Sequence, residues 1–252
     1  MRAATQLFWF LGSLAVAAGF VAAWQAICAL GLVSPIFLPP PDAVWGALVA
    51  GFATGDTLAN LAATVARVFG GWLLASAVGA SVGALIGVSR RARIYIAPSL
   101  EFLRPLPVSA LVPIFIGILG FSEQMVLTVI AFGALWPVLL GTVHGFSAVE
   151  PRLYEVASTL RMSRLAVIGK IALPSALPDI LAGMRVGLTV SLILVVVAEI
   201  LGSREGLGYA ILLAQRAYRS ADLFAGIALL GLIGYLTALA LNRLEARLIH
   251  WR

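Results

Sequence analysis

Few side chains in this 252-residue chain could do chemistry of their own. The single lysine, Lys170, could complete a phosphate-binding loop, which requires Gly, four residues and then Gly-Lys-Ser/Thr. Ile171 follows this lysine, however, and Arg164 stands where the first Gly is needed. His144 has no second His, Cys or acidic cluster at ligand spacing, and we identify no Ser or Cys as a candidate nucleophile for it. We therefore expect no metal, no bound cofactor and no catalytic residue in this chain.

Two ionisable residues, Arg185 and Glu199, bracket one long apolar segment. Their separation along a helix is about 21 Å, so they cannot pair with each other. Ionisable groups within membrane segments often line cavities or transport pathways. Both are therefore pathway candidates, Arg185 as an inner gate or anion contact and Glu199 as an outer gate. The alternative for each is snorkelling or pairing with a neighbouring helix, and for Arg67 and Arg104 we expect interfacial anchoring.

The composition places these residues in a membrane protein. Hydrophobic side chains make up 62% of the chain and charged ones only 11%, whereas soluble domains are about 25% charged. Charge-free runs of 18 residues or more recur, close to the ~20 residues that a helix needs to cross a bilayer. They occupy residues 3–41, 68–89, 105–122, 124–149 and 223–242. This pattern excludes a cytosolic enzyme and a disordered chain, and the lone Cys28 excludes an intramolecular disulfide framework.

The apolar runs predict an all-α fold with six membrane-spanning helices. The first run is too long for the core of a signal peptide, so we expect a retained helix. Pro105, Pro107 and Pro113 predict a broken or kinked third span. We expect Asp42 to cap a weakly amphipathic stretch that lies at the outer membrane surface and reaches about Asn60. A short helix is also expected within the outer loop 202–221. The six spans are expected at about 7–32, 62–88, 105–120, 124–148, 176–201 and 222–242.

The net charge of +6 follows the predicted topology. Basic residues lie in small groups beside the spans, so the positive-inside rule explains them without nucleic acid. An inner N-terminus puts three arginines outside, namely Arg204, Arg216 and Arg219. The same orientation puts eleven basic residues inside: Arg2, Arg90, Arg91, Arg93, Arg152, Arg161, Arg164, Lys170, Arg243, Arg247 and Arg252. Both chain ends are therefore expected in the cytoplasm.

Small residues repeat at four-residue spacing in several spans. The longest series is Ala75, Gly79, Gly83 and Gly87, and two shorter pairs are Gly141 with Gly145 and Gly183 with Gly187. Small residues let helices approach closely in lipid. We expect this series to serve packing within one subunit, and the pattern alone does not identify a dimer face.

The predicted inner loop between spans four and five carries a short amphipathic helix of its own. Pro151 suits the first turn of a helix. Leu153, Val156 and Leu160 then recur at three- and four-residue spacing, which predicts one apolar stripe. We expect the segment to stop at Pro174 and the fifth span to follow Pro178. From periodicity alone, the helix could lie flat on the bilayer or contact a soluble partner.

This loop resembles the EAA loop of binding-protein-dependent ABC transporter permeases. In that family Glu-Ala-Ala is followed by three residues, Gly, nine residues and Ile-x-Leu-Pro. Here Glu155, Val156 and Ala157 are followed at the same spacing by Arg161 in place of Gly, and then by Ile171, Leu173 and Pro174. The nitrate/sulfonate/taurine branch of the family also shares segments elsewhere: Leu38-Pro39 with Pro41, residues 101–107, Gly183-Met184-Arg185, residues 196–199, residues 206–209 and the closing residues 248–252.

The resemblance implies a type I ABC importer in which two permease copies, here a homodimer, enclose the pathway. A separate ATPase subunit would bind ATP and Mg, and a substrate-binding protein would deliver the solute and contact the outer end near Glu199. The coupling segment, residues 150–174, would insert its helix into a groove of the ATPase. The residues that the resemblance assigns to this coupling are Leu153, Glu155, Val156, Ala157, Leu160, Arg161, Arg164, Ile171, Leu173 and Pro174.

The resemblance further implies residence in a bacterial inner membrane. We expect residues 1–60 to form the first span and an outer-face segment, and residues 61–252 to form the permease core. The branch imports sulfonates, taurine, nitrate, bicarbonate and also vitamin precursors, so an anion is expected and a vitamin precursor is the alternative. A different class, an ion-coupled secondary transporter, would predict inverted repeats, which the sequence does not display. An intramembrane enzyme lacks a catalytic set.

Overall fold

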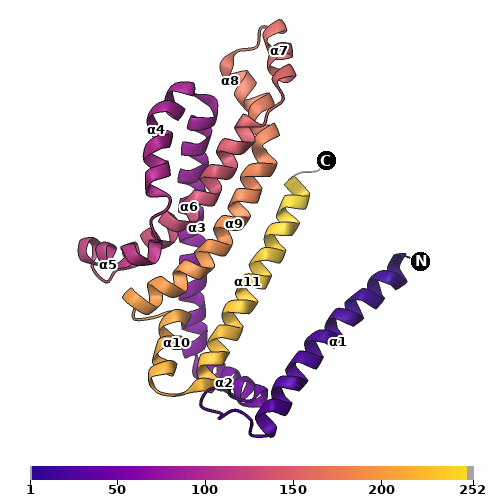
Figure 1. The fold of residues 1–252 in the computed structure, drawn as a ribbon, viewed down its shortest axis with the longest axis vertical. Helices are drawn as coiled ribbons and strands as arrows, with labels where there is room; N and C mark the ends of the chain where they lie inside the picture. Colours follow the sequence, from indigo (N-terminus) through magenta and orange to yellow (C-terminus); the bar gives the residue numbers. More distant parts are fainter. Residues whose placement is uncertain (1, 249–252) are drawn as a thin grey trace.

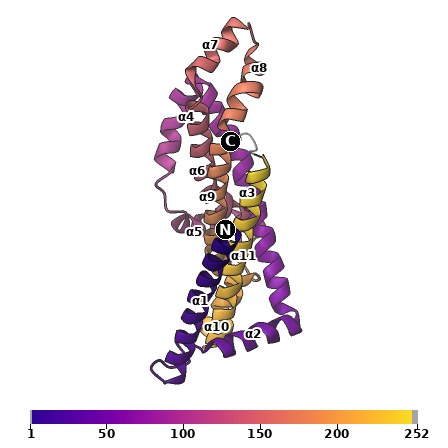
Figure 2. The same ribbon diagram turned by 90° about the vertical axis from the view of Figure 1, so that its right-hand side faces the viewer.

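The computed structural model describes residues 2–248, and within that range every element is helical. Three long helices form the core: α3 (Asp56–Val88), α6 (Glu123–Ser147) and α9 (Leu173–Gly202). They lie side by side along the long axis of the molecule (Figures 1 and 2). Their shared interior is apolar and fully packed, with side chains that include Val68, Val129, Ile130 and Val195.

The remaining helices surround this core. α11 (Ser220–Leu248) runs beside α9, and α10 (Leu207–Arg216) and α2 (Pro41–Thr54) close one end of the molecule (Figure 1). α1 (Arg2–Ala29) leaves that end and diverges from the rest of the bundle. Its apolar residues are not covered by other parts of the subunit. At the opposite end stand α7 (Pro151–Thr159) and α8 (Arg164–Val167). The start of α1 and the end of α11 both lie on the side of α2 that faces α7 (Figure 1).

Five described helices are long and apolar enough to cross a membrane, and a bent pair makes a sixth candidate. That pair is α4 (Arg90–Leu103) with α5 (Val108–Leu119), which meet at 95°. The expected break in the third span is confirmed, and it lies at Pro105 and Pro107, whereas Pro113 stands inside α5. Because α5 is only 12 residues long, about 18 Å, it cannot span a bilayer without α4. The sequence had not predicted α4.

Two other boundaries differ from the predictions. Pro40, not Asp42, is the N-cap of α2, and Asp42 lies in its first turn, where Oδ1 accepts the backbone N–H of Ala43 at 2.9 Å. The α2 helix ends at Gly55, whose φ of 86° permits the sharp reversal into α3. The short helix expected in 202–221 is confirmed as α10.

The fifth span starts earlier than predicted. A π-helical turn, η1 (Ile168–Ala172), joins α8 to α9 without a break, so Pro174 lies in the first turn of α9 and Pro178 inside it. The wider turn lets the N–H of Leu173 donate to the C=O of Ile168, five residues back. Such bulges relieve the backbone around a proline, so the prolines did not end the helix.

The small-residue series packs within the subunit, as predicted. Gly79, Gly83 and Gly87 of α3 face Val138, Thr142 and Phe146 of α6 in turn. At the next crossing, Gly141 of α6 and Gly183 of α9 bring the two backbones into contact. The core is therefore built on contacts that leave no space for a side chain at these positions.

Candidate functional site

The coupling segment projects from the end of the molecule opposite α2 and α10 (Figure 1). α7 begins at Pro151, as predicted, with Glu150 as its N-cap. The apolar stripe is exposed, with 39% of Leu153, 56% of Val156 and 68% of Leu160 accessible. Only Ala157 of α7 is buried, at 2%. A helix that exposes its apolar face beyond the body of the chain is suited to a protein partner.

Glu155 is exposed beside this stripe. Its backbone C=O accepts hydrogen bonds from the hydroxyls of Ser158 and Thr159 at 2.7 and 3.1 Å. Its carboxylate makes no hydrogen bond or ion pair with any residue in the range 2–248. The charge is therefore free to pair with a group outside the subunit.

A tight turn after α7 places Arg161 in a left-handed conformation, with φ of 50°. The N–H of Arg161 donates to the C=O of Ser158 and the N–H of Met162 donates to the C=O of Ala157, both at 3.0 Å. This is the Schellman arrangement, which normally places Gly at this position. The arginine thus keeps the turn that the family's glycine makes, at the expense of backbone strain. Tyr218, after α10, is the second described non-glycine residue with positive φ.

Replacing Arg161 with glycine should therefore stabilise the turn. Left-handed backbone costs a residue other than glycine about 1–2 kcal/mol, so we expect a gain of about 1 kcal/mol once the greater flexibility of unfolded glycine is deducted. Hydrogen exchange of the Met162 amide should slow in Arg161→Gly. The matched control is Leu160→Gly, where φ is −78° and exchange should accelerate. Faster exchange in Arg161→Gly would show that side-chain contacts of the arginine outweigh the strain.

The other predicted coupling residues occupy different surroundings. Ile171 packs against a buried cluster that includes Phe146 and Ala176. Leu173 is 45% exposed at the start of α9, and Pro174 lines a cavity of about 200 Å³ together with Leu153. Arg164 is exposed and faces a separate cavity toward the α3–α4 turn. The segment is therefore anchored at its α9 end and exposed along α7.

The two pathway candidates lie in contrasting positions. Arg185 is half-exposed and pairs with Glu245 of α11, which is the helix–helix pairing that we gave as the alternative. Glu199 is completely buried inside the subunit. A pathway role for either residue stays a prediction.

Glu199 belongs to a buried charge network, defined by Arg67, Glu123, Glu199 and Glu205. Arg67 is 3% exposed, and its guanidinium reaches all three carboxylates: Nε to Glu123 at 3.0 Å, Nη1 to Glu199 at 3.1 Å and Nη2 to Glu205 at 2.8 Å. Glu123 and Glu205 have half or more of their side chains exposed. Arg67 is therefore held by carboxylates of its own subunit, and its role as an interfacial anchor stays a prediction.

The network also holds the N-terminus of α10. The N–H groups of Gly206, Leu207 and Gly208 donate to Asn60, Thr64 and Glu199 at 2.7, 2.8 and 2.8 Å. Helix N-termini leave such donors without partners within the helix. Thr64 also donates to Glu199 at 2.9 Å. Asn60 and Thr64 of α3, together with Glu199 of α9, therefore hold the turn between α9 and α10 against α3.

The sequence carried one signal for this network. Asn60, Thr64 and Arg67 are spaced by four and three residues, so they form a polar stripe on one face of an otherwise apolar helix. A polar stripe inside a spanning helix indicates buried partners, because lipid cannot satisfy it. The spacing does not say which residues those partners are.

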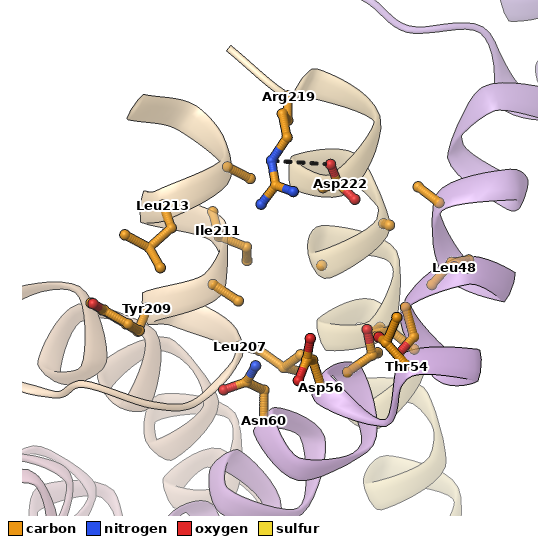
Figure 3. A pocket seen from close by; sticks show the side chains of 18 of the residues that line it. Leu48, Thr54, Asp56, Asn60, Leu207, Tyr209, Ile211, Leu213, Arg219 and Asp222 are labelled. Carbon is orange, nitrogen blue, oxygen red and sulfur yellow. Dashed lines mark hydrogen bonds and ion pairs between the residues drawn. The ribbon is translucent and has the colours of Figure 1, made fainter. Parts of the chain in front are cut away.

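A cavity of about 580 Å³ adjoins the network between α2, α3, α10 and α11 (Figure 3). Its wall is mixed, with the apolar side chains of Leu48, Leu207 and Ile211 beside the polar ones of Thr54 and Asn60. Charged groups stand around it: Arg219 pairs with Asp222 at 3.5 Å, and Asp56 lies at the start of α3. This end therefore offers charges of both signs around a depression of mixed polarity.

Comparisons with known proteins agree with these features. The family described as "Binding-protein-dependent transport system inner membrane component" matches residues 75–250. A Bacillus subtilis protein named as an aliphatic sulfonates transport permease is 37% identical over 97% of this chain and 88% of its own length. The Escherichia coli taurine transport system permease protein is 32% identical over 96% and 88%. An inward-facing structure of the MetNI methionine ABC transporter superposes with a TM-score of 0.67 at 19% identity, over 78% of this chain and 97% of its own.

Proposed function

The chain belongs to the family of binding-protein-dependent transport system inner membrane components, and from that premise we propose how its parts serve transport. It is the permease subunit of an ABC importer. This excludes the ion-coupled secondary transporter that the sequence left open. We propose a small anion as the solute, of the sulfonate or taurine kind, because two relatives above 30% identity carry those names. A vitamin precursor carried by the same machinery is the second candidate.

The exposed stripe of α7 is the observation that carries the proposed coupling mechanism. Leu153, Val156 and Leu160 would enter a groove of an ATPase subunit, which binds ATP and Mg. The unpaired carboxylate of Glu155 would set the orientation, since charge pairs at interfaces serve specificity more than affinity. Movement of the ATPase pair would then reach α6 and α9, between which the coupling segment is held.

The proposed orientation places α7 in the cytoplasm and α2 and α10 outside. The excess of basic residues on the α7 side supports it. The outer cavity and its charged rim would then face the substrate-binding protein. We propose a homodimer because an ABC importer needs two permease halves, and α1 leaves its apolar surface uncovered within one subunit. The cytoplasmic position of both chain ends follows from the same orientation.

Substitution of Val156 with aspartate tests the coupling role. Val156 is exposed, so the fold should tolerate the change, but a charge in an apolar groove is expensive. We expect Val156→Asp to lower the affinity for the co-expressed ATPase by on the order of 100-fold, about 3 kcal/mol, measured by co-purification and by ATP hydrolysis stimulated by binding protein. Leu58→Asp, near the start of α3 at the opposite end, also exposed and outside the lining of the cavity there, is the matched control. Equal ATPase assembly in the two variants would contradict the proposal.

The solute requires a separate measurement. Uptake of labelled taurine, an aliphatic sulfonate and a vitamin precursor should be compared in proteoliposomes that hold the permease, the ATPase and the cognate binding protein. We expect ATP-dependent uptake of a sulfonate-bearing anion. Uptake of the vitamin precursor alone would favour the second candidate and leave the coupling mechanism intact.

A further inference from the structure

A second cavity, of about 860 Å³, lies at the α7 end between the α3–α4 turn and the coupling segment. In Figures 1 and 2 the α7–α8 segment stands beyond the end of that turn. Three arginines line the cavity, Arg90 and Arg91 at the start of α4 and Arg164 at the start of α8. Its lining contains no Asp or Glu. The cavity is thus basic on both of its sides.

None of these three guanidinium groups has a partner within residues 2–248. Two other arginines do have partners: Arg67 contacts three carboxylates, and Arg93, two residues beyond the cavity, donates to Ser147 at 3.0 Å. Three like charges around one space repel one another, and an anion between them removes that repulsion. Arginine is also the side chain that best matches the oxygens of a phosphate group.

The position of the cavity along the membrane normal favours a lipid headgroup as the anion. From Arg67 to Val88, the end of α3, the helix rises about 32 Å, the thickness of the hydrocarbon core. With the Arg67 network at the outer edge, the α3–α4 turn lies at the level of the inner headgroups. The cavity wall adds Val88, Met162 and Ile168 to the arginines, so it offers apolar surface beside the charges. Basic pockets of this kind on the cytoplasmic side suit anionic lipid headgroups.

We propose that the cavity between the α3–α4 turn and the coupling segment binds the phosphate headgroup of an anionic phospholipid. The proposal rests on the orientation given under the proposed function. An ATPase contact fits less well, because Tyr154, Ala157 and Ser158 line the cavity, about 120° around α7 from the exposed stripe. The headgroup would bridge α4 and α8 and hold the coupling segment against the core.

Native mass spectrometry of the purified full chain tests this, with phosphatidylglycerol and phosphatidylcholine added separately. We expect retention of phosphatidylglycerol alone. The triple change Arg90→Gln, Arg91→Gln and Arg164→Gln should weaken retention by on the order of 100-fold, since each basic residue near an anionic surface contributes roughly a factor of five. The control with the same charge change is Arg216→Gln, Arg243→Gln and Arg247→Gln, which should keep the lipid. Lysine at the three cavity positions should also keep it, because the charge remains.

Three outcomes would overturn the proposal. Equal loss in the two glutamine variants would show a general charge effect, and loss in the lysine variant would show that the charges are not what holds the lipid. Displacement by millimolar inorganic phosphate or by the ATPase would assign the cavity to that ligand. Each of these results would leave the permease function standing, whereas failure of the Val156→Asp test would not affect lipid retention.

Discussion

Replacing Arg67 with methionine should destabilise the chain by about 3–5 kcal/mol, the usual effect of removing one member of a buried ion pair. The reason is that Glu199, which is completely buried, would lose its only cationic partner among the described residues. Its remaining bonds to Thr64 and the Gly208 N–H do not neutralise the charge. The free energy of unfolding, measured by denaturant titration in mixed micelles, is the observable.

The exposed members of the network provide the matched controls. Glu123→Gln and Glu205→Gln remove carboxylates that are half or more exposed, so each should cost no more than about 1 kcal/mol. The double variant Arg67→Met with Glu199→Leu should recover part of the loss, since an apolar pair tolerates burial better than one isolated charge. Full stability of Arg67→Met alone would contradict a structural role for the network.

The network also explains why α10 begins where it does. Gly206 has φ of 104°, and a side chain at 208 would lie 2.8 Å from the backbone oxygen of Val196. Both positions therefore require glycine, and the three N–H groups that follow the turn need acceptors from other helices. Arg67 holds the acceptor Glu199 in place and also donates to the backbone C=O of Glu205 at 2.9 Å. Loss of Arg67 should therefore loosen the outer end, next to the cavity that we assign to the binding protein.

Sequence reasoning succeeded where the signal was local. Pro151 predicted the start of α7, and Pro105 with Pro107 predicted the break before α5, because proline acts on its own turn of helix. It failed where the outcome depends on distant residues. The partners of Arg67 lie 56 to 138 positions away, so no spacing rule could bring them together. Pro174 led to a wrong prediction of where the coupling segment stops. The helix continues from the π-helical turn η1 into α9, with Pro174 in the first turn of α9.

Arg161 shows the limit of carrying a motif over by spacing alone. Because Arg161 stands where the family has glycine, the sequence did not show whether the tight turn after α7 would form. The structure contains this turn, with Arg161 in a strained left-handed conformation. The motif spacing was enough to place the coupling segment but not to describe its backbone. The sequence likewise could not show that the carboxylate of Glu155 is unpaired, because this depends on which residues the fold brings near it.

Replacing Gly183 with alanine should destabilise the core by about 1–3 kcal/mol, the range expected for overpacking. A Cβ at this position would lie 2.6 Å from the backbone oxygen of Pro137 in α6, which cannot move without the helix. Gly141→Ala should behave alike, because its Cβ would lie 2.6 Å from the backbone oxygen of Asp179 in α9. Thermal unfolding of the detergent-solubilised chain, followed by gel filtration, measures both.

Gly231→Ala on α11 is the control, because no heavy atom lies within 4 Å of its added Cβ. Alanine favours a helix over glycine by about 1 kcal/mol, so this variant should be unchanged or slightly more stable. The difference between the Gly183 and Gly231 variants matters for function, because α6 precedes the coupling helix α7 in the chain and α9 follows it. The glycine contacts bring the backbones of these two helices together, so we expect a displacement of α7 to move both. If Gly183→Ala were as stable as Gly231→Ala, the close approach of α6 and α9 at this crossing would not be required for the fold.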